Sequence, residues 1–352
     1  MRIAVLDDYS DAFRRVAAFP RLAGHDVAIF RDTEKDPERL AERLRDAEAV
    51  VLTQQRSAFP RAVIERLPRL RLVAQTGRSA AHIDLAACTE RGIVVSAVGA
   101  GGPHATAELT WGLILASLRH IPEEVDRLRG GAWQATVGTG LHGRTLGVYA
   151  FGRIGSRVAE VGRAFGMRVL CWGREGSLAR AAAAGFEPAA SREAFFEQAD
   201  VLTLHLPLNA ETRGIVTAAD LGRMKATSLL VNTSRAGIVA EGALVDALRA
   251  GRPGSAAVDV YEDEPVLGAN HPLLHLPNAL CTPHLGYVEW DTLESLYGAV
   301  VDGILAYAAG APLNVLNPEA LAVPREDAAG AERAGPSQGS RTDRRDDEAR
   351  RP

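Results

Sequence analysis

The strongest constraint on the fold is the regular alternation of short apolar runs with stretches that have the spacing of amphipathic helices. In the first hundred residues, the apolar runs predict buried strands at 3–6, 26–30, 49–52, 72–74 and 93–96. Helical patterns lie between them, for example at 37–47 and 60–67. Strands that alternate with helices are typical of a parallel sheet with helices on both faces. The sequence therefore predicts the α/β class.

A second series of the same kind occupies the later part of the chain. Its predicted strands are 145–150, 168–172, 201–204, 229–232, 256–260 and 279–282. The two series are separated by a breaker run at 99–103, a helix over about 104–120, a short helix that ends at Leu128 and a glycine-rich arm at 130–143. A last helix is predicted over about 290–309. A chain of 352 residues is too long for one compact core, so two domains are expected.

The composition is that of a globular protein, with 47% hydrophobic and 24% charged residues. A net charge of −4 gives no electrostatic reason to expect nucleic acid or an acidic membrane as partner. The longest apolar stretch, around 109–118, is shorter than the ~18 residues of a membrane span. Cys88, Cys171 and Cys281 have no C-x-x-C spacing and favour a reducing compartment. Because the amino terminus has no signal-peptide pattern, we expect a cytoplasmic protein, and we expect no metal site.

The segment RTLGVYAFGRIG joins a predicted strand to a predicted helix. It contains Ala150-x-Gly152-x-x-Gly155, the dinucleotide-binding fingerprint with alanine in place of the first glycine. The middle glycine lets the backbone approach a pyrophosphate, and the last lets helix and strand pack closely. The start of the helix, at Arg153 and Ile154, would turn free amides and a positive dipole end toward the phosphates. A merely structural turn is the alternative, because such turns are common in α/β proteins.

The residue that would select between the two nicotinamide cofactors is expected at the end of the next strand. The sequence there is Cys171-Trp172-Gly173-Arg174, with no carboxylate to bind a ribose 2′-hydroxyl. Arg174 could instead meet the 2′-phosphate of NADPH. An exposed surface arginine is the alternative. The expectation is therefore an NAD(P)H cofactor, with NADPH favoured and NADH left open.

Three later segments each follow a predicted strand: NTSRAG at 232–237, DVYEDEP at 259–265 and TPHLG at 282–286. They are therefore expected together at the carboxyl edge of the sheet, where open α/β folds bind ligands. In this order and spacing they resemble the D-isomer-specific 2-hydroxyacid dehydrogenase family, over roughly residues 45–317. The resemblance implies hydride transfer between NAD(P)H and a 2-keto or D-2-hydroxy acid, as in glyoxylate and hydroxypyruvate reductases or phosphoglycerate dehydrogenases.

By position, Arg235 matches the family's catalytic arginine, Glu264 matches its acid, and His284 matches its histidine. Elementary chemistry supports each role. The planar guanidinium of Arg235 suits a carboxylate beside a carbonyl group. The imidazole of His284 can deliver a proton to the carbonyl oxygen and remove it in the reverse reaction. Glu264 can hold that imidazole in one tautomer and favour its protonated form.

The resemblance also assigns positions around the two ligands. Near the cofactor it implies His205, Pro207, Thr233, Ser234, Asp259 and Gly286, with a structural loop residue as the alternative for His205. The family's substrate loop, G-x-G-x-D-x-I-D, is matched by GRSAAHID at 77–84, in which serine replaces the second glycine. Gly77, Arg78 and Ser79 are therefore candidates for substrate binding, with a surface cation as the alternative for Arg78. Further candidates for substrate contact are Gln75, Arg56 and His104.

The resemblance finally implies a domain arrangement. A Rossmann domain at 99–287 is expected to be inserted in a flavodoxin-like substrate domain, which is formed by 1–98 and completed by 288–317. Both sheets would be doubly wound, and the helices predicted near 104–120 and 290–309 would cross between the domains. The arm at 130–143 is the kind of element that a homodimer could exchange. Residues 318–352 have almost no large apolar side chains and are expected to be a disordered tail.

Three other interpretations are considered. A formate dehydrogenase is disfavoured, because that branch pairs its histidine with glutamine, where this chain has Glu264. A phosphoglycerate dehydrogenase stays open, although many members carry a regulatory domain for which the tail after Pro318 is too short. A nicotinamide-sensing binding protein, like the C-terminal binding protein corepressors, shares the fold and can keep the same three residues. Turnover of a 2-keto acid would distinguish the enzyme from the binding protein.

Overall fold

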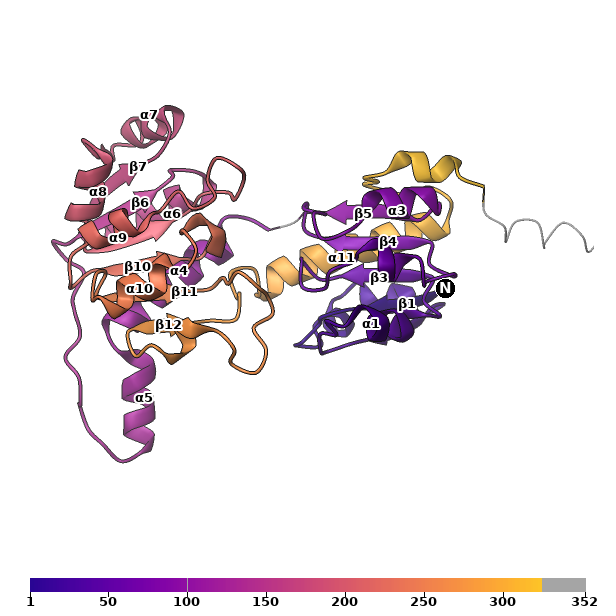
Figure 1. The fold of residues 1–352 in the computed structure, drawn as a ribbon, viewed down its shortest axis with the longest axis horizontal. Coiled ribbons are helices and arrows are strands. Elements are labelled where there is room, and N and C mark those ends of the chain that lie inside the picture. Colours follow the sequence, from indigo (N-terminus) through magenta and orange to yellow (C-terminus); the bar gives the residue numbers. More distant parts are fainter. Residues whose placement is uncertain (100, 325–352) are drawn as a thin grey trace, which may run out of the picture.

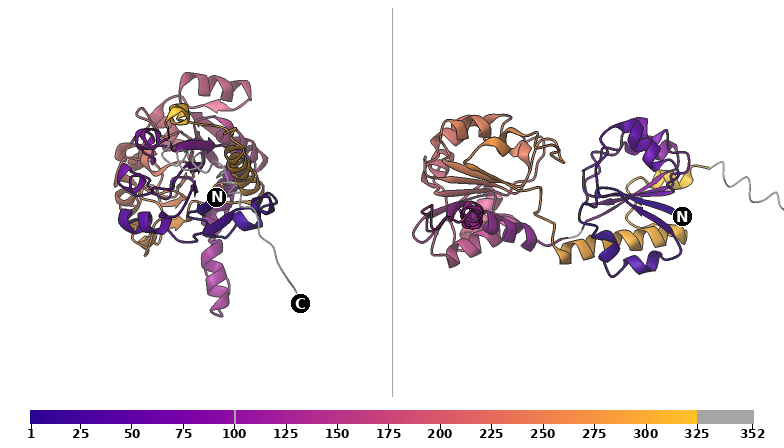
Figure 2. Two further views of the ribbon diagram at one scale, coloured as in Figure 1. Left: turned by 90° about the vertical axis from the view of Figure 1, so that its right-hand side faces the viewer. Right: turned by 90° about the horizontal axis from the view of Figure 1, so that it is seen from below.

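The computed structural model of the protein describes residues 1–99 and 101–324, which form two lobes joined by a narrow connection (Figure 1). Each lobe is built around one parallel sheet, the first of five strands and the second of seven. The predicted α/β class with two parallel-sheet domains is therefore confirmed. Viewed from below, the two sheets stand on either side of a gap (Figure 2).

The first sheet lies in the lobe that holds the amino terminus. Its strands are β1 (Arg2–Val5), β2 (Asp26–Ile29), β3 (Ala49–Leu52), β4 (Leu72–Thr76) and β5 (Val94–Val98), in the order β2-β1-β3-β4-β5. All neighbouring strands are parallel, and this order is that of the flavodoxin-like fold. Strand β3 is buried along its whole length, which explains its uninterrupted apolar run.

Helices cover both faces of this first sheet. One face is covered by α1 (Pro37–Leu44), α2 (Arg61–Ile64) and α3 (Leu85–Glu90). The other is covered by the 3-10 helices η1 (Phe13–Arg15) and η2 (Phe19–Leu22) and by α11 (Trp290–Ala308). Helix α1 begins after Asp36, whose carboxylate accepts hydrogen bonds from the amides of Glu38 and Arg39. This cap explains why the helix starts where the sequence predicts.

Helix α11 packs on the first sheet although it follows the second sheet in the sequence. Leu293, Tyr297, Val300 and Ile304 recur at intervals of three and four residues and therefore form one apolar face. All four are buried against strands of the first sheet. This packing is what completion of the first domain by residues 288–317 would require, while the domain limits themselves stay a prediction.

The second sheet fills the other lobe. Its strands are β6 (Thr145–Tyr149), β7 (Arg168–Trp172), β8 (Glu187–Pro188), β9 (Val201–Leu204), β10 (Leu229–Asn232), β11 (Ser255–Val258) and β12 (Ala279–Cys281). They are parallel and follow the order β12-β11-β10-β9-β6-β7-β8. Read from β8, this order is that of the Rossmann fold. Strand β8 was not predicted, because its two residues at the sheet edge carry no apolar run.

Helices again cover both faces of the second sheet. The buried cluster on one face involves α8 (Arg192–Gln198), α9 (Ala218–Arg223) and α10 (Ala243–Arg249). The cluster on the other face involves α4 (His104–Leu118), α6 (Arg153–Ala164) and α7 (Glu175–Ala183). The remaining short helices are η3 (Ala236–Ile238) and η4 (Pro272–His275). Because the strands of this sheet are all parallel, their carboxyl ends lie at one common edge. The loops that follow the strands meet at this edge.

Helix α5 (Ile121–Arg129) and the segment after it project away from the rest of the second lobe (Figure 1). The helix buries none of its residues. The predicted arm at 130–143 has no helix or strand, and its Trp133 and Val137 are 77% and 93% exposed. This apolar surface has no cover within the described residues of the chain.

The sequence predicts a disordered tail from residue 318, but the structure has a folded segment beyond that position. Residues Pro318–Ala322 form the 3-10 helix η5, and Ala320 is buried. The amide side chain of Asn317 anchors this segment, because its oxygen accepts from the amide of Val95 at 2.8 Å and its nitrogen donates to the carbonyl of Ile93 at 2.9 Å. A start at 318 is therefore too early, and the rest of the predicted tail, from 325, lies outside the described residues.

Candidate active site

The loop after β6 forms one wall of a cavity of about 710 Å³ at the carboxyl edge of the second sheet. Five of the residues predicted for the cofactor line it: Ala150, Gly152, Arg174, His205 and Pro207. These residues follow β6, β7 and β9, and the chain reverses its winding direction between β6 and β9. Such a switch point at the carboxyl ends of the strands is where doubly wound folds bind nucleotides.

The turn between β6 and α6 fits a pyrophosphate. Gly152 is the N-cap of α6, no side chain caps the helix, and a Cβ atom on this glycine would meet nothing within 4 Å. The first amides of the helix therefore remain open to an anion. A Cβ atom on Gly155 would lie 2.3 Å from the carbonyl oxygen of Ala150. Ala150 itself adopts φ = 76°, a conformation that glycine adopts without strain.

Arg174 lies at the rim of the same cavity. Its Nη1 atom is 3.3 Å from a carboxylate oxygen of Glu211, and the two side chains are 72% and 75% exposed. An exposed pair of this kind contributes little to stability and can be rearranged by a ligand. The side chains of two other predicted cofactor residues point elsewhere: Nη2 of Arg153 is 3.4 Å from the carbonyl oxygen of Gly101, and Ile154 packs on the core. Ile154 could therefore meet a cofactor through its backbone only, whereas the exposed side chain of Arg153 can be rearranged by a ligand.

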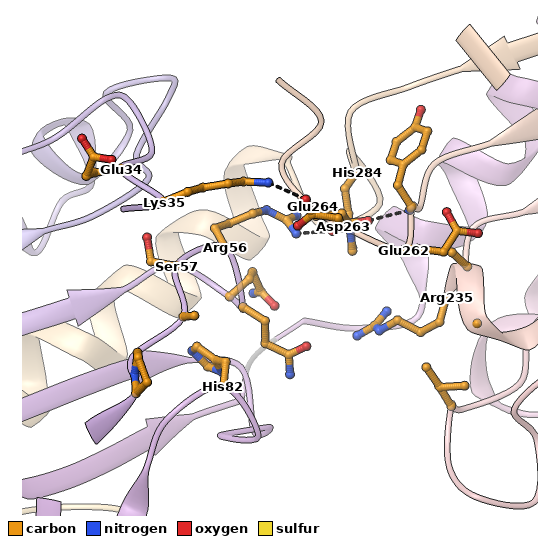
Figure 3. A pocket seen from close by; sticks show the side chains of 18 of the residues that line it. Glu34, Lys35, Arg56, Ser57, His82, Arg235, Glu262, Asp263, Glu264 and His284 are labelled. Atoms are coloured by element: carbon orange, nitrogen blue, oxygen red, sulfur yellow. Dashed lines mark hydrogen bonds and ion pairs between the residues drawn. The ribbon is translucent and has the colours of Figure 1, made fainter. Parts of the chain in front are cut away.

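The three residues predicted to be catalytic meet at a second cavity of about 500 Å³, which lies between the two lobes (Figure 3). Nδ1 of His284 is 2.6 Å from Oε2 of Glu264. The other oxygen of Glu264 accepts a hydrogen bond of 2.9 Å from the amide of Tyr261. Arg235 lines the cavity beside this pair. The structure therefore brings Arg235, Glu264 and His284 to one place.

Glu264 has a second charged partner, which comes from the first lobe. Nη1 of Arg56 contacts Oε2 of Glu264, and the two side chains are only 6% and 15% exposed. Burial by itself would raise the pKa of Glu264, but the contacts with His284 and Arg56 outweigh it and hold the pKa below its usual value. The carboxyl group is therefore ionised near neutral pH and available to the imidazole.

The turn after β10 orients Arg235. The side-chain oxygen of Asn232 accepts from the amide of Ser234, and its nitrogen donates to the carbonyl of Arg235, each at 3.0 Å. Nη1 of Arg235 donates to the carbonyl of Ser234, and no carboxylate in the described residues forms an ion pair with this guanidinium. Loss of hydration in the cavity lowers the pKa of Arg235, although an arginine stays charged near neutral pH. A charged donor group is therefore left for an anionic ligand.

Asp259 holds the loop that carries His284. Its carboxylate is fully buried and accepts from Oγ1 of Thr282 at 2.6 Å and from the amides of Leu285 and Gly286 at 2.7 and 2.9 Å. Burial raises the pKa of Asp259, and these hydrogen bonds oppose that effect. His284 has φ = 53°, which is an uncommon conformation for a residue with a side chain. The loop is thus held in its shape by Asp259, a role the sequence did not indicate.

Other predicted cofactor residues already have partners in the protein. Oγ1 of Thr233 is 2.8 Å from Oγ1 of Thr110, and the hydroxyl of Ser234 donates to the carbonyl of Leu204 at 2.9 Å. Nε2 of His205 is 3.0 Å from Oγ1 of Thr203, and burial lowers the pKa of His205 to about 4. These contacts fix the loops at the sheet edge.

The predicted substrate loop follows β4. Gly77 adopts φ = 93°, and Arg78 and Ser79 are exposed. The walls of the cavity that holds His284 do not include these three residues; they include Gln54, Arg56 and His82 instead. Of the additional candidates, Gln75 is buried and donates to the backbone carbonyls of Gln54 and Thr76, while His104 is exposed at the start of α4.

The sequence does not predict two features of this cavity. Arg56 is expected only as a substrate contact, and the structure also pairs it with Glu264. His82 was not considered, yet both of its ring nitrogens are buried without a hydrogen-bond partner among the described residues. Burial lowers the pKa of His82 to about 4, so this imidazole is neutral near pH 7. Its place within the GRSAAHID segment was the one available signal.

Comparison with known proteins agrees with this geometry. Residues 111–286 match the family model described as the NAD-binding domain of D-isomer-specific 2-hydroxyacid dehydrogenases. The chain is also 37% identical over 310 residues to the glyoxylate reductase of Aeropyrum pernix, covering 85% of this chain and 92% of that enzyme. This chain belongs to the D-isomer-specific 2-hydroxyacid dehydrogenase family. It is a nicotinamide-dependent oxidoreductase that acts on the CH–OH group of hydroxy acids.

Further relatives of this dehydrogenase support the same family assignment. The D-3-phosphoglycerate dehydrogenase of Methanocaldococcus jannaschii is 36% identical over 266 residues, which are 75% of this chain but only 50% of that protein. The crystal structure of a phosphoglycerate oxidoreductase from Vibrio cholerae has a TM-score of 0.84 at 47% identity, covering 88% of this chain and all of that one. The D-lactate dehydrogenase of Escherichia coli has a TM-score of 0.75 at 26% identity, covering 90% and 100%. None of these relatives supports the corepressor interpretation.

The described part of the dehydrogenase contains no helix with the length and apolar character that a bilayer crossing requires.

Proposed function

We propose that this dehydrogenase reduces a small 2-keto acid to the D-2-hydroxy acid, with His284 as the acid in reduction and the base in oxidation. The observation that carries the proposal is the 2.6 Å pairing of Glu264 with Nδ1 of His284 beside Arg235, for which the described residues supply no ion-pair partner. Because Nδ1 is engaged, Nε2 is the nitrogen left to exchange a proton with the substrate.

The reaction divides its tasks among these residues. A bound reduced nicotinamide supplies the hydride to C2 of the keto acid. Arg235 binds the carboxylate and polarises the carbonyl group, because its planar fork matches two neighbouring oxygens. His284 delivers a proton to the carbonyl oxygen as negative charge develops there, and Glu264 stabilises the imidazolium before that transfer. Gly77, Arg78 and Ser79 remain the proposed backbone partners of the substrate carboxylate, although they do not line the cavity that holds His284 in this structure.

The size of the substrate is proposed from the relatives. The similarity to two glyoxylate reductases extends over most of this chain and over 92% of each of those enzymes. Glyoxylate and hydroxypyruvate are therefore the first substrates to test, followed by pyruvate and phenylpyruvate. The assay measures oxidation of NADPH and of NADH with each keto acid. Absence of turnover with all four acids and both cofactors would contradict the proposal.

For the cofactor, we propose a preference for NADPH. The support is the exposed guanidinium of Arg174 at the rim of the cofactor cavity and the absence of a carboxylate at the end of β7. Arg174→Ala is expected to reduce kcat/KM for NADPH about 10- to 100-fold, because charge-assisted hydrogen bonds contribute about 1.5–3 kcal/mol, and to leave the value for NADH nearly unchanged. Glu211→Gln is the matched control, and it should favour NADPH further. A wild-type enzyme that clearly prefers NADH would overturn the preference.

For the assembly, we propose a homodimer that covers α5 and the arm at 130–143. The support is the exposed apolar surface of this projection, which includes Ile121, Leu128, Trp133 and Val137. Exposed apolar patches of this kind are typical of protein interfaces. Trp133→Asp is expected to convert a dimer to a monomer in sedimentation or light-scattering measurements. A wild-type protein that stays monomeric at micromolar concentration would contradict the proposal.

A further inference from the structure

One oxygen atom of Glu264 is shared between the two lobes. Oε2 lies 2.6 Å from Nδ1 of His284, and the same atom is contacted by Nη1 of Arg56. Arg56 follows β3 of the first sheet, whereas Glu264 and His284 follow β11 and β12 of the second. Figure 3 shows the guanidinium reaching the carboxylate from the side of the first lobe. The arginine therefore acts on an oxygen that the histidine already uses.

The surroundings hold Arg56 in this position. The residue is 8% exposed, and its guanidinium lies 5.9 Å from the ring centre of Tyr287. The ring of Tyr287 also meets the ring of His284 edge to face, with centres 5.7 Å apart. The next residue, Ser57, donates from its hydroxyl to the buried carboxylate of Asp7 at 2.9 Å, which fixes the loop. A buried arginine is costly unless its charge is compensated, and here the compensating group is the partner of His284.

We propose that Arg56 is a positioning residue that shares Glu264 with His284 across the cleft and thereby makes His284 a stronger acid when the two lobes are together. This inference rests on the proposed role of His284. It assigns to Arg56 a task other than direct substrate contact, because Nη1 of its guanidinium contacts the same carboxylate oxygen that pairs with His284.

The charges around the pair give the direction of the effect. The titratable groups that face His284, Glu264 and Arg56 are Asp7 and Tyr9 after β1, Arg235 after β10, Asp259 and Tyr261 after β11, and Tyr287 after β12. Without Arg56, the full negative charge of Glu264 favours the imidazolium. With Arg56 on the same oxygen, that charge is divided, and a second cation stands near the imidazolium. The proton is then released more readily to a developing alkoxide.

A second ion pair crosses the same cleft and provides a matched control. Nζ of Lys35 lies 2.8 Å from Oδ2 of Asp263, and the two side chains are 40% and 85% exposed. Like Arg56 and Glu264, this pair joins the first lobe to the segment after β11. It does not touch His284. A variant at Lys35 therefore removes a contact between the lobes without changing the charge on the carboxylate of Glu264.

The test is the pH dependence of kcat/KM for keto-acid reduction, which reports groups of the free enzyme. Arg56→Gln is expected to move the pH at which the rate falls upward by about one unit, because the imidazolium regains the whole charge of Glu264. Arg56→Lys, which keeps the charge, and Lys35→Gln should both move it by less than about 0.3 units. An unmoved profile in Arg56→Gln with a raised KM would overturn the proposal and make Arg56 a substrate-binding residue. Equal shifts in Arg56→Gln and Lys35→Gln would reduce Arg56 to a tether between the lobes, which also overturns the proposal.

A second measurement covers the case in which Arg56→Gln is inactive. The ¹⁵N NMR titration of His284, identified by the signal that disappears in His284→Gln, follows the imidazole without turnover. An upward shift in Arg56→Gln supports the inference, and no shift overturns it. The proposed function fails on a different result, namely a wild-type rate profile that His284→Gln leaves intact.

Discussion

The carboxylate of Glu264 and the imidazole of His284 are joined by a hydrogen bond of 2.6 Å between Oε2 and Nδ1. This bond fixes the ring orientation and leaves Nε2 free. It also gives the imidazole a negatively charged partner, since the pKa of Glu264 is held below its usual value by its contacts with His284 and Arg56. The consequences of this pairing can be measured through the pH dependence of the reaction.

Glu264→Gln should move the descending limb of the kcat/KM profile for keto-acid reduction to lower pH, by about one to two units. The amide keeps the size of the side chain and can still accept a hydrogen bond from Nδ1. It lacks the charge that stabilises the imidazolium, so the acid form is lost at lower pH. The exposed Glu262→Gln is the control and should leave the limb in place. An unchanged profile in Glu264→Gln would remove this residue from its role.

Alanine substitutions at two glycines of the cofactor turn should have different effects, one on the stability of the fold and the other on cofactor binding. A methyl group on Gly155 would lie 2.3 Å from the carbonyl oxygen of Ala150, so Gly155→Ala should destabilise the fold by about 1–3 kcal/mol. A methyl group on Gly152 meets no protein atom within 4 Å but would occupy the space beside the helix start. Gly152→Ala should therefore keep the wild-type melting temperature and weaken cofactor binding at least tenfold. Thermal unfolding with and without NADPH measures both quantities. Normal cofactor affinity in Gly152→Ala would show that the phosphates do not approach this turn.

Asp259→Asn should destabilise the loop that carries His284. One of its oxygens accepts from the amide of Gly286 at 2.9 Å and the other from the amide of Leu285 at 2.7 Å. Since the asparagine nitrogen cannot accept, one buried amide loses its partner, at a cost of about 1–3 kcal/mol. Denaturant unfolding should record this loss together with a fall in kcat. Asp263→Asn, on the exposed side of the same segment, should change neither. Wild-type stability and kcat in Asp259→Asn would show that the loop keeps its shape without this carboxylate.

Acid should destabilise the protein partly through buried histidines. Burial lowers the pKa of His82 and of His205 to about 4, from about 6.5 in the unfolded chain. The unfolded state therefore binds more protons between these values, and the stability that is present above pH 6.5 falls as the pH is lowered toward 4. His82→Gln should flatten the plot of unfolding free energy against pH in this window, by up to about 1.4 kcal/mol per pH unit. His275→Gln, at a histidine that is exposed, is the control variant. If His82→Gln has the wild-type slope, His82 is accessible to protons in the folded state.

The fold could be predicted because its signals are local. The apolar runs of strands such as β3, β9 and β10 are continuous, since these strands are buried on both faces of a parallel sheet. Because Arg235, Glu264 and His284 each follow a strand of the same parallel sheet, the sequence also predicts that they lie together at one sheet edge. Strand β8 escaped prediction because two residues at an edge leave no pattern. The early start of the predicted tail has a similar cause, since Asn317 anchors η5 through hydrogen bonds rather than through an apolar face.

The rest of the site could not be predicted because it depends on contacts between distant segments. Nothing in the sequence near Arg56 indicates that it meets Glu264, a residue of the other lobe. The same holds for Asp259, whose hydrogen bonds to the His284 loop require the spacing of β11 and β12 to be known. The burial of His82 depends on how the loop after β4 packs. These features follow from tertiary structure and carry no motif.

The most direct test of the central claim is the rate of keto-acid reduction by His284→Gln, measured beside its affinity for NADPH. We expect kcat to fall about 10²- to 10⁴-fold, because the proton donor is lost, while the dissociation constant of NADPH stays within about twofold of the wild-type value. Reduction of glyoxylate or hydroxypyruvate at the wild-type rate would contradict the account.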